Sequence, residues 1–154
     1  MTKGGTGTSP FYPARMVALP DTVREVLAGP HLAHVVTMNA DGSPHVTCVW
    51  VGVDRDEVVF GSLGGWRKLR NLERDPRIVL SVEAPGANAI GMQEYLVLHG
   101  TATVQPGGAP ELLQELARVY IGPDVRFPPM DDPPPGCVVR IAVHEVTGVG
   151  PWHD

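Results

Sequence analysis

Apolar and polar residues alternate through most of this chain with the two-residue period of half-buried β-strands. The alternation predicts six strands, over residues 32–39, 44–53, 57–62, 77–83, 95–104 and 138–149. The first two strands are expected to form a hairpin, because Asp41-Gly42 between them supplies the positive φ of a tight reversal. Gly100 predicts a bend or bulge in the fifth strand.

The spacing changes to that of a helix in three places: over residues 21–28, after the glycines that end at Gly65, and over residues 109–120. The inward positions expected in the last helix are Leu112, Leu113, Leu116 and Val119. Residues 85–94 and the proline-rich residues 122–136 are expected to be loops. Six antiparallel strands with three peripheral helices indicate a mostly-β fold, a small closed or partly split β-barrel.

Length and composition favour one globular domain, since 154 residues with 43% hydrophobic content can bury a single core. We expect this domain at residues 13–154, after a disordered tail at residues 1–12. No apolar run approaches the roughly 20 residues that span a bilayer, and no secretory signal is recognised, which predicts a cytoplasmic protein. The two cysteines lie far apart, as in proteins of a reducing compartment, and a net charge of −5 speaks against nucleic-acid binding.

One segment, from Trp66 to Arg77, runs against this acidic background because it holds five basic residues. The glycines before it permit a tight turn, after which the first amides and the dipole of the helix would face a bound anion, such as phosphate. Lys68 is the one lysine outside the predicted tail in a chain that otherwise uses arginine. The alternative is a solvated helix face, the commoner meaning of a charge run by itself.

Four segments resemble the split β-barrel superfamily of pyridoxamine 5′-phosphate oxidase. They are Asp41–Val46 (DGSPHV), Gly61–Glu83, residues 95–104 and Thr147–Trp152. The most specific pattern is K-x-x-N-L-x-x-D-P-R, which begins at Lys68. Within the superfamily, the chain most resembles the actinobacterial deazaflavin-dependent reductases that use coenzyme F420. The resemblance covers about residues 17–152 and implies a six-stranded antiparallel split β-barrel.

The choice of cofactor depends on a departure from the superfamily. Oxidases that hold FMN usually carry R-x-V-L-L-K on one strand; aligned on Pro44, this chain has Thr47 at the arginine position and Gly52 at the lysine position. The extra arginines of the basic segment suit F420, which has a phosphodiester and an oligoglutamate tail. F420 is therefore favoured, and FMN is the alternative.

The resemblance implies that the deazaflavin lies in a groove at a homodimer interface. The expected cofactor-binding residues are His45, Thr47, Val49, Gly61, Ser62, Trp66, Arg67, Lys68, Arg70, Asn71, Arg74 and Tyr95. The first three share one strand face and would contact the ring, whereas the basic residues would hold phosphate and tail. Alternatives stay open: His45 could be a surface histidine, Trp66 a helix cap, and Trp50 a core or dimer contact.

The implied activity is hydride transfer from reduced F420 to an electron-poor small molecule, and no catalytic acid can be named. A rival reading is a non-catalytic split-barrel carrier or sensor of F420, FMN or haem, which would use the same binding residues. No metal is expected, because His31 and His34 would face opposite sides of a strand with no further ligand nearby.

Apolar residues on the strands also predict the homodimer. Val49, Val51 and Val53 alternate on one strand, and Val139, Ile141 and Val143 on another. Together they form more apolar surface than one small interior is expected to hide. We expect a two-fold partner to cover the remainder and to contribute Trp152 and the loop before Tyr95 to the groove.

Overall fold

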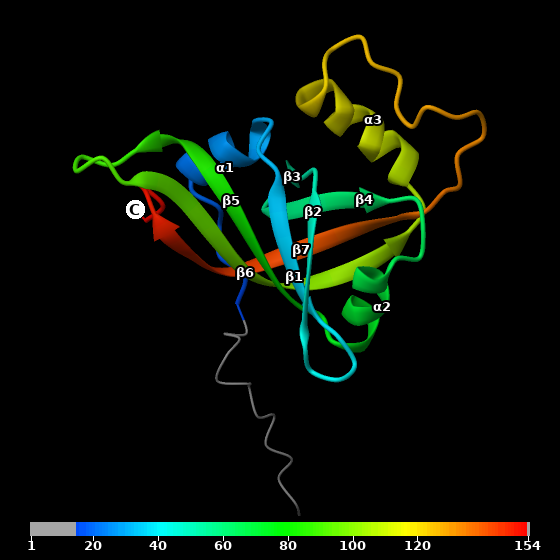
Figure 1. Cartoon of the computed structure of the whole chain (residues 1–154), viewed down its shortest axis with the longest axis horizontal. Helices are drawn as coiled ribbons and strands as arrows, with labels where there is room; N and C mark the ends of the chain where they lie inside the picture. Colours follow the sequence, from blue (N-terminus) through cyan, green and yellow to red (C-terminus); the bar gives the residue numbers. More distant parts are fainter. Residues whose placement is uncertain (1–14, 154) are drawn as a thin grey trace, which may run out of the picture.

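A computed structural model describes residues 15–153, so the tail predicted for residues 1–12 lies outside the described residues (Figure 1). The helices are α1 (Asp21–Ala28), α2 (Arg67–Arg74) and α3 (Ala109–Tyr120). The strands are β1 (Ala33–Met38), β2 (Pro44–Val49), β3 (Gly52–Asp54), β4 (Glu57–Ser62), β5 (Arg77–Ala87), β6 (Gln93–Pro106) and β7 (Cys137–Val149). None of the helices in the described residues is long and apolar enough to span a membrane.

The strands form one antiparallel sheet in the order β2-β1-β5-β6-β7-β4-β3. β2 and β3 occupy its two edges, yet only Trp50 and Val51 separate them in the chain. The chain therefore crosses directly from one edge to the other, which closes the sheet into a barrel. The prediction of one strand over residues 44–53 is wrong, and seven strands replace the six expected, because this stretch changes its pairing partner from β1 to β4.

Tyr120, the last residue of α3, stabilises the point where the partner changes. Its hydroxyl donates to the carbonyl of His31 at 2.9 Å and accepts from the amide of Val51 at 3.1 Å. Trp50 stacks on the Tyr120 ring with 5.5 Å between centroids and lies 5.0 Å from the ring of Phe127. These contacts satisfy backbone groups that the interrupted ladder leaves without strand partners.

Four of the six apolar residues expected to face a partner subunit lie inside the barrel instead, and Val49 and Val53 are partly buried. Val51, Val139, Ile141 and Val143 are at most 1% exposed. Trp152 is also buried, and its indole nitrogen donates to the carbonyl of Tyr95 at 2.8 Å. The prediction that a partner subunit must cover these buried residues is therefore wrong, since one chain buries them by itself.

Some of the other local predictions are confirmed and some are wrong. The bulge is confirmed, because the register of β6 against β7 shifts between His99 and Gly100. The bounds predicted for the first and third helices are confirmed. Val119, expected to face inward, is 44% exposed, and the loop expected at residues 85–94 is shorter, because β5 continues to Ala87 and β6 begins at Gln93.

Candidate functional site

A pocket of about 350 Å³ lies between the ends of β2 and β4, with the start of α2 beside it. We call it the lysine pocket. Its lining residues are Leu32, Cys48, Val49, Trp50, Gly61, Ser62, Leu63, Trp66, Lys68, Leu113 and Phe127. Five of the expected cofactor residues thus meet here, namely Val49, Gly61, Ser62, Trp66 and Lys68.

The floor of the lysine pocket depends on close packing of α3 against β4. A Cβ at Gly61 would lie 3.1 Å from Leu113 Cγ, so that a larger residue would push the helix away. The Ser62 hydroxyl donates to the carbonyl of Gly64 at 2.9 Å, which holds the turn before α2. Trp66, directly before the helix, is 62% exposed at the pocket rim. No side chain caps α2, so its first amides are available to a ligand.

Lys68 is the one cationic side chain of the lysine pocket. It is half-buried, and within residues 15–153 its ammonium has no hydrogen bond or ion pair. Burial lowers the pKa of Lys68, and the nearby Cys137 thiol acts weakly in the opposite direction. A partly desolvated ammonium without a counterion favours binding of an anion.

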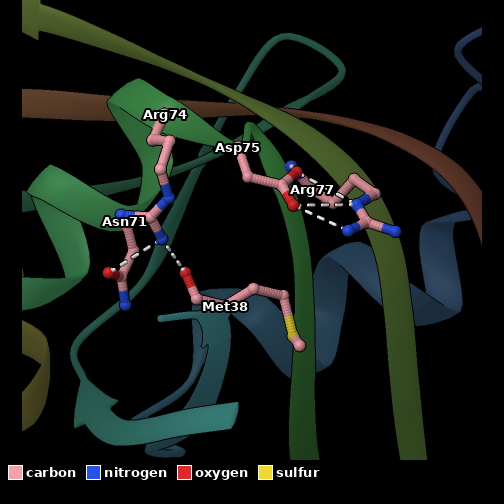
Figure 2. Close-up of polar contacts among 5 residues, drawn as sticks. All are labelled: Met38, Asn71, Arg74, Asp75 and Arg77. Carbon is pink, nitrogen blue, oxygen red and sulfur yellow. Dashed lines mark hydrogen bonds and ion pairs between the residues drawn. The ribbon is translucent and has the colours of Figure 1, made fainter. Parts of the chain in front are cut away.

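Three of the four other basic residues of the segment line a second pocket, of about 530 Å³, which we call the arginine pocket. Its lining residues are Asn39, Ala40, Asp41, Ser43, Arg67, Arg70, Asn71 and Arg74. Arg70 donates to the carbonyl of Gly65 at 2.6 Å, and Arg74 donates to the carbonyl of Met38 (Figure 2). Arg67 is exposed and makes no such bond within the described part of the chain. The structure therefore divides the basic segment between two pockets.

Asn71, expected beside a bound phosphate, is used mainly in the fold. It is 3% exposed, and its amide nitrogen lies 3.0 Å from both Thr37 Oγ1 and Asn39 Oδ1. Its side-chain oxygen accepts from Arg74 at 3.3 Å (Figure 2). These bonds attach α2 to the end of β1.

The final part of the K-x-x-N-L-x-x-D-P-R pattern is also structural. Asp75 accepts from the backbone amide of Arg77 at 3.2 Å and from its guanidinium at 2.7 Å (Figure 2). The Arg77 hydrogen bonds lower the pKa of Asp75. Leu72 is 3% exposed in the core. Most of the pattern thus fixes α2 between β1 and β5, and Lys68 is its member that faces the lysine pocket.

His45 and Thr47 lie on the same strand face as Val49, as expected, but outside both pockets. They are paired with Thr37 and Val35 of β1, whose side chains are 1% exposed, so this face points toward the barrel interior. His45 Nδ1 and Thr47 Oγ1 are buried atoms without a hydrogen-bond partner among the described residues. Buried polar atoms of this kind are uncommon in folded proteins and require a partner.

Tyr95 is the expected site residue that lies farthest from the others. It is 39% exposed near the start of β6, at the end of the barrel away from α2 (Figure 1). It lines neither the lysine pocket nor the arginine pocket. One chain therefore does not bring Tyr95 to the lysine pocket.

Sequence reasoning did not assign Leu32, Cys48, Trp50 or Leu63 to this site, and it also missed two residues from more distant parts of the chain, Leu113 and Phe127. Their positions depend on where α3 and the proline-rich segment pack, which no local pattern indicates. Among the described residues, no group of three or more His, Cys, Asp or Glu could hold a metal ion. Burial raises the pKa of the Cys137 thiol, which is the opposite of what activates a nucleophile.

The antiparallel barrel with its three helices defines a protein of the split β-barrel class. A family model described as pyridoxamine 5′-phosphate oxidase matches residues 19–150, and the chain belongs to this family. Among curated proteins, none matches this sequence.

Solved structures with the same fold include an F420 reductase, with 21% identity and a TM-score of 0.65 over 84% of this chain and 98% of that one. A conserved hypothetical protein from Mycobacterium tuberculosis has 20% identity and a TM-score of 0.67, covering 89% and 88% of the two chains. A FAD-binding protein from Mesorhizobium loti has 17% identity and a TM-score of 0.61, covering 87% and 95%. At these identities the likeness establishes the fold alone.

Proposed function

We propose that this protein is an F420-dependent oxidoreductase that reduces an electron-poor small molecule. The observation that carries the proposal is the unpaired, half-buried ammonium of Lys68 at the uncapped start of α2. Arg67 next to it is exposed and has no hydrogen bond or ion pair in the described part of the chain, and its charge acts on Asp41 in the arginine pocket. Together they form an anion site of the kind that a cofactor phosphodiester requires.

Two positions favour F420 over FMN. Thr47 and Gly52 stand where FMN oxidases of the family usually carry arginine and lysine. A Cβ at Gly52 would already lie 3.1 Å from Leu116 of α3, so this chain has little room there for a lysine. The basic charge lies instead in α2, in an arrangement suited to a ligand with several carboxylates.

The residues present fit such a cofactor. Lys68, Arg67 and the first amides of α2 would hold the phosphodiester, next to Gly61 and Ser62. The unpaired His45 Nδ1 and Thr47 Oγ1 would bond polar edges of the ring. Arg70 and Arg74 would meet the oligoglutamate tail in the arginine pocket, because each guanidinium has five N–H donors and can bind a carboxylate beside its bond to the backbone.

When bound, reduced F420 supplies a hydride to the substrate. The chain's own contribution is to bind the cofactor, to orient it toward the substrate and to exclude water. Leu113, Phe127 and Trp66 provide the apolar wall of the lysine pocket, and a dry wall strengthens the charge interactions of Lys68. The Ser62 hydroxyl already donates to a carbonyl, so we assign the proton that completes the reduction to solvent.

A titration of fluorescent F420, run beside FMN, tests the cofactor. Replacing Lys68 with Met keeps the length of the side chain but removes its charge, and should weaken F420 binding by about 1 to 3 kcal/mol. The thermal midpoint should hardly change. Glu73→Gln, an exposed neighbour on the same helix, is the matched control and should not weaken binding. An unchanged dissociation constant for the Met variant would mean that the basic face of α2 is solvated and does not bind the cofactor.

Turnover then separates the enzyme from the carrier or sensor that binds F420, FMN or haem. Oxidation of reduced F420 by menadione or an unsaturated lactone, faster with the protein than without it, supports the reductase. Binding without turnover favours the carrier, and micromolar binding of FMN with no response to F420 would replace the cofactor proposed here.

We further propose a homodimer that covers the outer face of β2. Val46 is 55% exposed on this edge strand and Leu32 is 50% exposed beside the lysine pocket, so the apolar surface continues into the proposed groove. Light scattering should give twice the 16.5 kDa chain mass. Val46→Lys should shift the mass to that of the monomer, whereas Met16→Lys, at a 48% exposed site next to the residue that bonds β7, should not. A wild-type monomer at micromolar concentration that binds F420 would refute the shared groove.

A further inference from the structure

A third pocket, of about 580 Å³, lies beside α3 and shares no lining residue with the lysine pocket or the arginine pocket. We call it the α3 groove. One wall is α3, the opposite wall is β3, and the floor comes from β4 and β7 (Figure 1). Its volume is in the range of pockets that hold small organic molecules. Neither the family resemblance nor the proposed function gives it a role.

The interior of the α3 groove is apolar. Val51, Val59 and Leu116 are at most 6% exposed and form its deepest part. Leu112 and Val119 extend this surface along α3, and Val119 is 44% exposed although it is apolar. The exposure of Val119, unexpected from the helical spacing, is explained if a ligand with an apolar body lies against it.

The rim of the groove is acidic. Glu111 and Glu115 lie one helical turn apart on α3, and neither has a hydrogen bond or ion pair within residues 15–153. The C-terminal end of α1, at Ala28, adds the negative end of a helix dipole. The one cation of the lining, Arg140, is already bound to Asp54 at 2.9 Å and to Glu57 at 3.4 Å. The rim is therefore negative beyond what Arg140 neutralises.

We propose that the α3 groove binds a small organic cation with an apolar body, such as an aralkyl amine or a quaternary ammonium compound. The apolar floor would cover the body, and Glu111 and Glu115 would pair with the charge. An anion is disfavoured by the rim.

The test is an NMR titration of the ¹⁵N-labelled full chain without cofactor, using benzyltrimethylammonium as the probe. Neopentylbenzene, which has the same shape without the charge, and benzenesulfonate, which has the opposite charge, are the comparison ligands. The cation should shift the amides of Gly52, Gly108 and Leu116, which line the groove, in a saturable way. Neither comparison ligand should reach the same occupancy.

Variants then test the assignment of charge. E111Q together with E115Q should raise the dissociation constant of the cation about tenfold, because two ion pairs are lost. E145Q removes an exposed carboxylate outside the groove and should leave it unchanged. Equal binding of the neutral ligand, no saturable shift with the cation, or an unchanged constant in the double variant would each overturn the proposal. Shifts of the same amides on raising protein concentration alone would assign the groove to a second copy instead.

Discussion

Replacing Asn71 with Ala gives the sharpest test of how α2 is held. The Asn71 side chain is 3% exposed and donates to Thr37 Oγ1 and Asn39 Oδ1, each at 3.0 Å. Thr37 is itself 1% exposed. The variant therefore removes these two hydrogen bonds and the weaker one that Asn71 Oδ1 accepts from the exposed Arg74 at 3.3 Å, and it leaves a buried Thr37 hydroxyl that water reaches poorly.

The expected cost follows from these two effects. Each hydrogen bond contributes about 1 kcal/mol net, and a buried polar group left without a partner costs about 1 to 3 kcal/mol. Because the Asn39 side chain is only partly buried and water can replace its partner, we expect a total of about 2 to 4 kcal/mol. In a domain of this size, that loss lowers the thermal midpoint by about 5 to 12 °C.

Urea unfolding followed by tryptophan fluorescence, with thermal unfolding by circular dichroism, measures both quantities. The control is Thr37→Val, which removes the hydroxyl but leaves the Asn71 amide bonded to Asn39 and should cost about 1 kcal/mol. The double variant should cost less than the two single losses combined, since both remove the same bond. An Asn71→Ala protein of wild-type stability that binds F420 poorly would refute this reasoning, because it would show that Asn71 binds the cofactor and does not hold the helix.

Two further predictions concern other parts of the fold. The Arg77 hydrogen bonds lower the pKa of Asp75, so they stabilise the folded protein above the ordinary Asp value of 3.8, and this stability is lost as pH falls through the lower folded pKa. Asp75→Asn should therefore cost about 1 kcal/mol at pH 7, with a difference from wild type that shrinks toward pH 3 in urea titrations; a difference independent of pH would contradict this. A Cβ at Gly100 would lie 2.6 Å from the carbonyl oxygen of Ala142, so Gly100→Ala should lower the unfolding free energy by about 1 to 3 kcal/mol. Gly122→Ala, where no atom lies within 4 Å of a Cβ, is the control and should be nearly neutral.

The fold could be predicted from the sequence as far as its determinants are local. Alternation and turn residues marked the strands, and Gly100 marked the bulge. The break after Val49 had no such mark, because apolar residues continue through Trp50 and Val51. It is fixed by the hydroxyl of Tyr120, which is 69 positions from Val51 in the chain. No local pattern contains that contact.

The candidate site could also be predicted only where the signal is local in the sequence. Lys68 follows from charge and the neighbouring glycines, since both are visible in the sequence. The structural role of Asn71 does not, because the family pattern does not distinguish residues that bind a ligand from residues that hold the helix. Only its burial against Thr37 makes that distinction.

These two roles depend on each other. Burial lowers the pKa of Lys68, which means that the folded state holds the charged ammonium at a cost. A helix free to move would turn this side chain into water and lose the anion site. The bonds of Asn71 to β1 and of Asp75 to Arg77 prevent that movement, so the stability they contribute keeps Lys68 half-buried. An anion that binds there replaces the hydration that the Lys68 ammonium loses on burial. Because folding has already desolvated and oriented this ammonium, the anion binds more tightly than it would to a lysine in water.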